Sequence, residues 1–161
     1  MDPLEMNKDK EFLTRAIEIA LSGISSGGGP FGAVLTRNGK IISESNNRVV
    51  LLKDPTAHAE ILVIRQAARL LGTHDLSSCI LYSSCEPCPM CLAAIYWSGI
   101  KRILYSSDRN DAATYGFSDS YIYKEICMNP SDRQITFQRE IITGAQDVFK
   151  KWEEFVDKIC Y

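Results

Sequence analysis

Two short segments of this sequence hold residue types whose spacing points to metal chemistry. The first is His58-Ala59-Glu60, and the second begins with Pro87 and contains Cys88, which is 30 positions after His58, and Cys91. Cysteines three residues apart on a helix present both sulfurs on one face. Near a helix N-terminus, the positive end of the helix dipole favours the thiolate, which is the form that binds metal. We therefore expect His58, Cys88 and Cys91 to ligate one ion.

The number of ligands indicates a catalytic zinc site. Zn²⁺ prefers four ligands, and one His with two Cys leaves the fourth position to water. Zinc lowers the pKa of such a water toward about 7. Glu60 is the nearby carboxylate that can take its proton and deliver it to a substrate nitrogen. The pattern H-x-E followed by P-C-x-x-C is typical of zinc deaminases of nucleobases.

Cys85 leaves two alternatives open. Because Cys85, Cys88 and Cys91 form C-x-x-C-x-x-C, Cys85 as a fourth ligand would give a closed zinc site without chemistry, and Cys85 with Cys88 would give a redox pair. Cys85 precedes Pro87 and so lies outside the predicted helix, and Glu60 has no purpose in a purely structural site. Both observations favour the catalytic interpretation.

The elements that must position these residues alternate between helices and strands. Apolar residues at helical spacing over 12–21 predict an amphipathic first helix, and Asn38-Gly39 between apolar runs predicts a hairpin. Asp54-Pro55 predicts the start of a helix that holds His58 in its first turn, and Pro87 predicts the start of the helix that carries the two cysteines.

The rest of the chain continues this alternation. Core strands are predicted over 79–83 and 102–105, a further strand over 135–137, and a closing amphipathic helix over 148–159. Crossover connections of this kind produce a sheet covered by helices on both faces. The sequence contains no repeat and no linker, so we expect residues 1–161 to form one α/β domain.

Composition excludes several classes of protein. The 161 residues are 45% apolar and 24% charged, as in globular domains, and the net charge of −2 argues against nucleic acid as the main partner. The start of the chain has no basic segment followed by an apolar run, and no stretch is apolar enough to span a bilayer. We therefore expect a cytoplasmic protein without a membrane partner, in which the cysteines stay reduced.

Four sequence blocks carry a resemblance to a known family. Residues 29–34 (GPFGAV), 54–60 (DPTAHAE) and 84–91 (SCEPCPMC) resemble the cytidine-deaminase-like superfamily of zinc hydrolases, including its tRNA adenosine deaminases and cytosine deaminases. Residues 111–120 (DAATYGFSDS), the continuation over 121–126 (YIYKEI) and the terminal Tyr161 are similar to the guanine deaminases of bacteria. The resemblance implies a three-layer α/β/α fold with a central mixed sheet.

The resemblance also implies roles for individual residues. It implies zinc on the three ligands named above and Glu60 as the proton shuttle. It further implies that Asn46 hydrogen-bonds the purine edge and that the Ala59 backbone meets the ring carbonyl or its developing oxyanion. Asp119 would contact the base and help to protonate the leaving amine. Tyr161 would close the pocket from the partner subunit, because the family exchanges its C-terminal segment within a homodimer.

These expectations lead to a hypothesis and its rivals. The hypothesis is hydrolytic deamination of guanine, a small purine base, to xanthine and ammonia in purine metabolism. One rival is deamination of another aminated ring, such as guanosine, cytosine, an aminotriazine or adenosine in tRNA. A rival of a different class is a non-catalytic, zinc-stabilised binding module, which requires four protein ligands including Cys85.

Overall fold

The computed structural model describes residues 3–160 of the chain. The chain divides into two compact units, Met1–Ser120 and Tyr121–Tyr161. Among the described residues, no helix is both long and apolar enough to cross a membrane.

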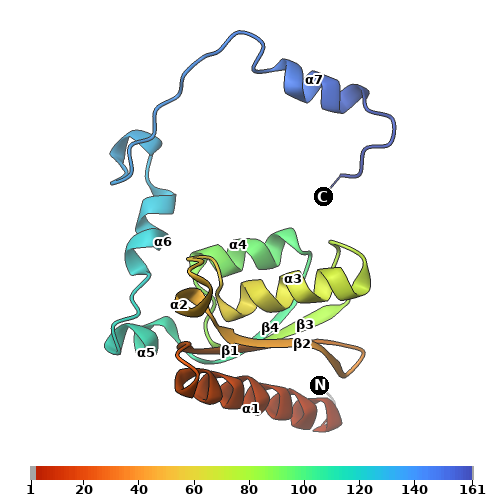
Figure 1. Ribbon diagram of the computed structural model, residues 1–161, viewed down its shortest axis with the longest axis vertical. Helices are drawn as coiled ribbons and strands as arrows, with labels where there is room; N and C mark the ends of the chain where they lie inside the picture. The colour runs from red at the N-terminus through yellow and green to blue at the C-terminus, as the bar shows by residue number, and fades with distance from the viewer. Residues whose placement is uncertain (1–2, 161) are drawn as a thin grey trace. The chain divides into compact units, whose positions relative to one another are not determined.

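The first unit is built on a mixed four-stranded sheet with the strand order β2-β1-β3-β4 (Figure 1). β1 (Gly29–Arg37) pairs antiparallel with both β2 (Lys40–Asn47) and β3 (Cys79–Cys85), whereas β3 pairs parallel with β4 (Arg102–Ser107). In the turn between β1 and β2, Asn38 and Gly39 have φ values of 52° and 67°. Both residues are left-handed, as the predicted hairpin turn requires.

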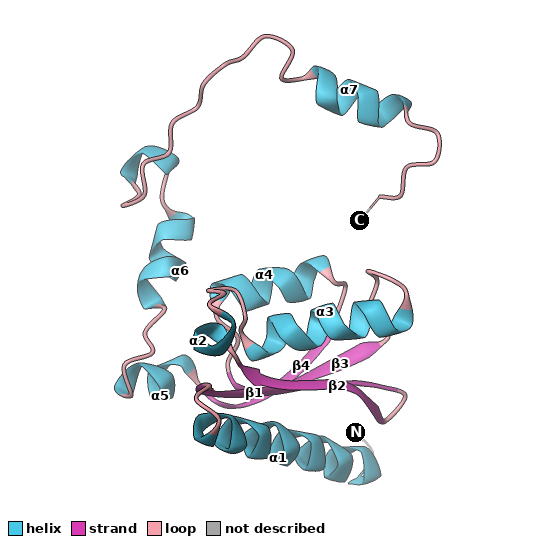
Figure 2. Ribbon diagram, in the orientation of Figure 1, coloured by secondary structure: helices cyan, strands magenta, loops and turns pink. Residues whose placement is uncertain are grey.

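Helices cover both faces of this sheet (Figure 2). α1 (Pro3–Ser25) lies on one face, and α3 (Ala59–Leu71) and α4 (Pro89–Trp97) lie on the other. The single turn α2 (Val49–Leu52) follows β2, and α5 (Arg109–Thr114) follows β4. The predicted three-layer α/β/α fold with a central mixed sheet is confirmed.

The side chains of β3 separate the two layers of the core. Leu81 packs with Val63 of α3 and Ile95 of α4, whereas its neighbour Tyr82 packs with Ala16 of α1. This alternation follows from the period of two residues in a strand. The same period directs Ser83 toward the face that carries α3 and α4.

A buried polar contact fixes α1 to the sheet. Asp9 is only 7% exposed, and its carboxylate accepts a hydrogen bond of 2.6 Å from Tyr82 Oη and one of 2.6 Å from Arg102 Nη2. Burial and the neighbouring carboxylate raise the pKa of Tyr82, so its hydroxyl stays a donor. The Asp9 charge is thus paired, which a buried charge requires.

The second unit consists of short helices without a core of their own. It contains α6 (Ser120–Cys127), the 3₁₀ turn η1 (Pro130–Asp132) and α7 (Asp147–Glu154). Arg133 closes the end of α6 by donating hydrogen bonds to the carbonyls of Glu125, Ile126 and Met128. None of residues 121–160 is buried. Its exposed aliphatic and aromatic side chains include Ile126, Ile135, Phe137, Ile141, Ile142, Val148, Phe149, Trp152, Phe155, Val156 and Ile159.

Two predicted elements of this second unit were wrong. Residues 135–137 form no strand, and the closing helix ends at Glu154 instead of reaching residue 159. A strand needs a pairing partner, and most helical stability comes from packing an apolar face against a neighbour. None of the residues in these two segments is buried, so their apolar side chains add little to stability.

The two helix starts near the candidate site were also misplaced. The helix expected from Asp54-Pro55 begins at Ala59, because the Asp54 carboxylate caps a turn by accepting hydrogen bonds from Thr56 N and Oγ1 at 2.8 and 2.7 Å. The helix expected from Pro87 begins at Pro89. Each shift leaves a predicted metal ligand at the N-cap of its helix.

Candidate metal centre and active site

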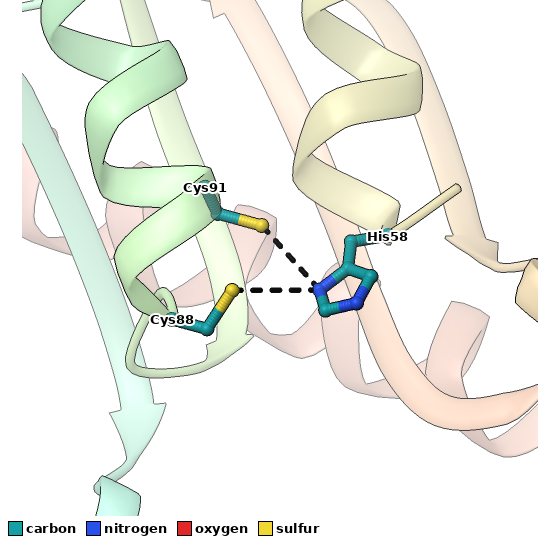
Figure 3. A group of neighbouring side chains, drawn as sticks. All are labelled: His58, Cys88 and Cys91. Atoms are coloured by element: carbon teal, nitrogen blue, oxygen red, sulfur yellow. Dashed lines mark hydrogen bonds between the residues drawn. The ribbon is translucent and has the colours of Figure 1, made fainter. Parts of the chain in front are cut away.

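Two helix N-termini bring the predicted metal ligands together (Figure 3). His58 is the N-cap of α3, Cys88 is the N-cap of α4, and Cys91 lies in the first turn of α4. The His58 side chain makes no capping hydrogen bond to α3. All three side chains point toward one another, from one helix start to the other.

The spacing of these ligand atoms fits zinc. His58 Nδ1 lies 3.5 Å from Cys88 Sγ and 3.6 Å from Cys91 Sγ, and all three ligand atoms lie within 4.8 Å of one another. A tetrahedral zinc ion, with bonds of about 2.3 Å to sulfur and about 2.1 Å to nitrogen, separates the two ligands by about 3.6 Å. One imidazole nitrogen with two thiolates is also a donor set that zinc favours.

The two cysteines divide their protons unequally. Hydrogen bonding from Cys91, with a further contribution from His58, lowers the pKa of Cys88 to about 4 despite its burial. The same bond to Cys88, together with burial, raises the pKa of Cys91. The pair therefore releases one proton readily and retains the second, because two adjacent buried thiolates repel each other until a cation joins them.

Glu60 is a buried carboxylate directly beside these ligands. It lies in the first turn of α3 with only 6% of its surface exposed. Its Oε1 accepts a hydrogen bond of 3.1 Å from Ser83 Oγ, and its Oε2 accepts one of 3.5 Å from Cys91 Sγ. Burial raises the pKa of Glu60. A carboxyl group in this position can both accept a proton and return it.

One cavity is lined by two of the predicted metal ligands and by two carboxylates that the sequence predicts at the site. It measures about 240 Å³, and His58, Glu60, Cys88 and Asp119 line it. Asp119 is partly buried, and burial raises its pKa.

Two aromatic rings form another part of the cavity wall. Phe31 and Phe117 both line the cavity, and they pack edge to face with ring centroids 5.0 Å apart. The cavity therefore combines metal-ligating groups, three carboxylates (Glu60, Glu86 and Asp119) and an aromatic wall, a combination suited to a small aminated ring.

The other predicted contact residues lie elsewhere or outside the described residues. Neither Asn46 nor Ala59 is among the described residues that line the cavity. Asn46 Nδ2 donates to the carbonyl of Asn47 at 3.3 Å, and its side chain packs so closely that a Cβ on Gly23 would lie 2.3 Å from it. Tyr161 lies outside the described residues. Their roles stay predictions.

Cys85 is a poor fourth ligand. Its Sγ donates a hydrogen bond of 3.5 Å to the carbonyl of Asp108, and among the described residues the only cluster of metal-ligating atoms is His58, Cys88 and Cys91. Burial raises the pKa of Cys85 to about 11, so it stays a thiol near neutral pH. In this form it is a poor redox nucleophile.

Sequence reasoning missed two interactions at the site. Arg109 donates to both oxygens of Glu86, at 3.2 Å from its backbone N and 2.9 Å from Nη2, and both residues line the cavity. No local pattern links these two residues, because Glu86 follows β3 whereas Arg109 begins α5. Ser83 could have been found, since it stands two residues after Leu81 in a predicted core strand, on the side that faces α3.

Comparison with known proteins places this chain in a family. The family model for the cytidine and deoxycytidylate deaminase zinc-binding region matches residues 6–107. Over 151 residues the chain is 49% identical to the guanine deaminase of Bacillus subtilis, which covers 93% of this chain and 97% of that protein. It is also 44% identical over 96 residues to the tRNA-specific adenosine deaminase of Aquifex aeolicus, covering 60% of this chain and 64% of that protein.

Solved structures agree with these sequence matches. The X-ray structure of the B. subtilis guanine deaminase superposes with a TM-score of 0.92 at 48% identity, over 94% of this chain and 98% of that one. A guanine deaminase structure from Nitrosomonas europaea superposes with a TM-score of 0.66 at 30% identity, over 74% of this chain and 75% of that one. The fold and site thus define a zinc-dependent hydrolase with a cytidine-deaminase-like fold.

Within that class, the chain belongs to the cytidine and deoxycytidylate deaminase family, as the family model and the full-length B. subtilis relative show. It is an enzyme, and zinc is its cofactor. The resemblance stated from the sequence is confirmed.

Proposed function

We propose that this chain catalyses the zinc-dependent hydrolytic deamination of guanine to xanthine and ammonia. The observation that carries the proposal is a three-ligand zinc site that opens into the same cavity as Glu60 and Asp119. It occurs in a chain that is 49% identical to a guanine deaminase along 93% of its length. An open ligand position, a buried proton carrier and a ring-sized cavity are the parts that hydrolysis of an aromatic amine requires.

The proposed mechanism assigns the proton transfers to Glu60. His58, Cys88 and Cys91 would hold zinc, which would act as the Lewis acid that makes water nucleophilic near neutral pH. Glu60 takes a proton from the attacking water and gives it to the ring nitrogen beside the carbon that carries the exocyclic amine. Glu60 then carries the second proton of the water to the amine. The carbon–nitrogen bond breaks, ammonia leaves, and the new carbonyl of xanthine remains.

Four further residues complete the proposed substrate site. Asp119 contacts the base and helps to protonate the leaving amine, a role supported by its place on the cavity wall. Asn46 bonds the purine edge, and the Ala59 backbone meets the ring carbonyl. Tyr161 closes the pocket. Similarity to a guanine deaminase along nearly the whole chain supports these last three roles.

The protein is proposed to act as a homodimer that exchanges its C-terminal segment. In the second unit no residue over 121–160 is buried, although this segment is rich in apolar side chains. On α4, Tyr96 and Trp97 are 78% and 69% exposed. Apolar surface of this extent is typical of a surface that a partner covers. In this proposal residues 1–161 form one domain that is completed in the dimer.

Two broader proposals concern the cellular setting. The protein acts in purine metabolism in the cytoplasm, on a small-molecule base and not on a nucleic acid or a membrane. The net charge of −2 supports this choice, because proteins that bind nucleic-acid phosphates carry a basic surplus.

The test is ammonia release by the purified zinc-loaded protein with guanine, beside guanosine, adenine, cytosine and a tRNA. We expect release with guanine only. Turnover of guanosine would keep the mechanism but require a pocket that admits ribose. Silence on every substrate by a protein that holds zinc would overturn the proposal in favour of the binding module.

A further inference from the structure

The carboxylate of Glu60 is held from the sheet by a buried hydroxyl group. Ser83 Oγ donates a hydrogen bond of 3.1 Å to Glu60 Oε1, and Ser83 is only 1% exposed. We propose that Ser83 is a positioning residue, which fixes one oxygen of Glu60 so that the other is aimed at the reacting atoms. This inference rests on the proposed function and deepens it.

The backbone around Ser83 makes it a rigid anchor. Ser83 lies in β3, where it pairs with Ala33 of β1 on one side and with Tyr105 of β4 on the other. A strand bonded on both sides cannot move its side chain by shifting the backbone, because ladder bonds on both edges would have to break. The Ser83 hydroxyl is therefore a fixed point, against which the carboxylate of Glu60 is oriented.

The neighbours of Ser83 along its face of β3 are apolar, so they do not explain a polar side chain there. The residues of β3 on the same face, Cys79 and Leu81, belong to the apolar core shared with α3 and α4. A hydroxyl group in such a place costs free energy unless it forms a hydrogen bond. The bond to Glu60 supplies that compensation and accounts for a serine at this position.

The two oxygens of Glu60 have different neighbours. Oε1 accepts from Ser83 Oγ in the sheet, whereas Oε2 accepts from Cys91 Sγ at 3.5 Å, on the side of the predicted metal ligands. Fixing Oε1 to the sheet therefore leaves Oε2 as the oxygen next to the metal site.

Removing the hydroxyl should impair turnover far more than substrate binding. Ser83 is not among the described residues that line the cavity, so its loss takes no contact from the substrate. A small displacement of the Glu60 carboxylate from its productive position should lower the rate about tenfold to a hundredfold. We expect kcat for guanine to fall by that amount, with KM and zinc content unchanged.

The experiment uses one pair of variants that differ only in the hydroxyl group. Ser83→Thr and Ser83→Val have the same shape, and Ser83→Ala removes the hydroxyl without adding bulk. Steady-state kinetics with guanine, zinc content and thermal melting are measured for each. We expect Ser83→Thr to keep wild-type kcat within about threefold, whereas Ser83→Val and Ser83→Ala fall tenfold or more.

Ser43→Ala is the matched control for the loss of any bond between the sheet and α3. Ser43 is also buried in the sheet, and its Oγ donates a hydrogen bond of 2.8 Å to the carbonyl of Val63 in α3. Ser43→Ala removes this bond without touching Glu60. We expect it to lower the melting temperature while leaving kcat close to that of the wild type.

A crystal structure of the zinc-loaded Ser83→Ala variant supplies a readout besides activity. We expect the Glu60 carboxylate to rotate or to occupy more than one position. An unchanged carboxylate, or an unchanged kcat in both Ser83→Ala and Ser83→Val, would overturn the inference while leaving the proposed function intact. Failure of both variants to fold or to hold zinc would also overturn it, since Ser83 would then be a stability residue. A wild-type protein inactive on guanine would instead refute the proposed function.

Discussion

The two units of this protein differ in how far their apolar side chains are buried. Residues up to Ser120 bury many of theirs in two layers, with Leu81 and Val63 on one side of the sheet and Tyr82 and Ala16 on the other. None of residues 121–160 is buried, although this segment also contains many large apolar side chains. Apolar content alone therefore does not make a core. A core requires elements that stack in layers.

This difference separates two requirements of the active site. The first unit supplies rigidity: the zinc ligands stand at the starts of helices that pack on the sheet, and Glu60 is held by the sheet itself. The second unit has apolar surface to offer and little internal structure of its own. On this account the first unit carries out the chemistry, and the proposed dimer depends on the second unit.

The largest expected effect is the loss of turnover when Glu60, in the first unit, is changed. Glu60→Gln keeps the shape of the side chain but cannot carry a proton, so we expect kcat for guanine to fall by about 10³-fold to 10⁴-fold while zinc stays bound. Steady-state kinetics and metal analysis measure both. Glu11→Gln, on the exposed side of α1, is the control and should behave as the wild type. Substantial activity in Glu60→Gln would refute the mechanism.

The next effect distinguishes the ligands from the neighbouring cysteine. Cys88→Ser removes a thiolate from the metal, and we expect zinc affinity to fall by more than about 100-fold. Cys85→Ser is the matched control, because its sulfur bonds to a backbone carbonyl and stays protonated. It should keep zinc and activity. Competition with a chelator measures both affinities, and loss of zinc from Cys85→Ser would revive the closed four-ligand site.

A smaller effect is expected when the apolar surface of the second unit is changed. Trp152→Glu puts a charge on α7, where Trp152 stacks with Phe155 at 6.2 Å between ring centroids. We expect the dimer dissociation constant to rise about tenfold or more, as burial of an unpaired charge costs at least 1.4 kcal/mol. Sedimentation equilibrium measures it, with Lys151→Glu as the control for added charge. A wild-type protein that is monomeric at all concentrations would contradict the proposed assembly.

The smallest effect concerns pH and a surface contact of the first unit. Arg15 donates to both oxygens of Glu44, at 3.0 and 2.6 Å, and this hydrogen bonding lowers the pKa of Glu44. A lowered pKa in the folded state stabilises the protein above the unfolded pKa, and this contribution is lost as pH falls through the folded value.

Because this pair is partly exposed, the contribution is under about 1 kcal/mol. Urea unfolding of the wild type and Glu44→Gln checks it. The variant should be the less stable of the two at pH 7, and the difference should disappear in acid. A difference that persists unchanged at low pH would show that the charge of Glu44 contributes nothing.

What the sequence could predict was local. The turn residues Asn38 and Gly39, and the ligands His58, Cys88 and Cys91, lie in short motifs whose spacing carries their geometry. The Arg109–Glu86 pair could not be predicted, because Glu86 follows β3 and Arg109 begins α5, and only the pairing of β3 with β4 brings these two positions together. The side of β3 on which Ser83 lies could be predicted from the strand period, but its hydrogen bond to Glu60 depends on how α3 packs against the sheet. The predicted closing helix was too long, because periodicity shows an apolar face but not whether anything packs against it.

The most direct test of the central claim is the conversion of guanine by the zinc-loaded protein in water labelled with oxygen-18. The account predicts xanthine that carries one labelled oxygen, together with one equivalent of ammonia, because water supplies the new carbonyl oxygen. Mass spectrometry of the product and an ammonia assay measure both. Guanine recovered unchanged, or xanthine formed without the label, would contradict hydrolytic deamination at this site.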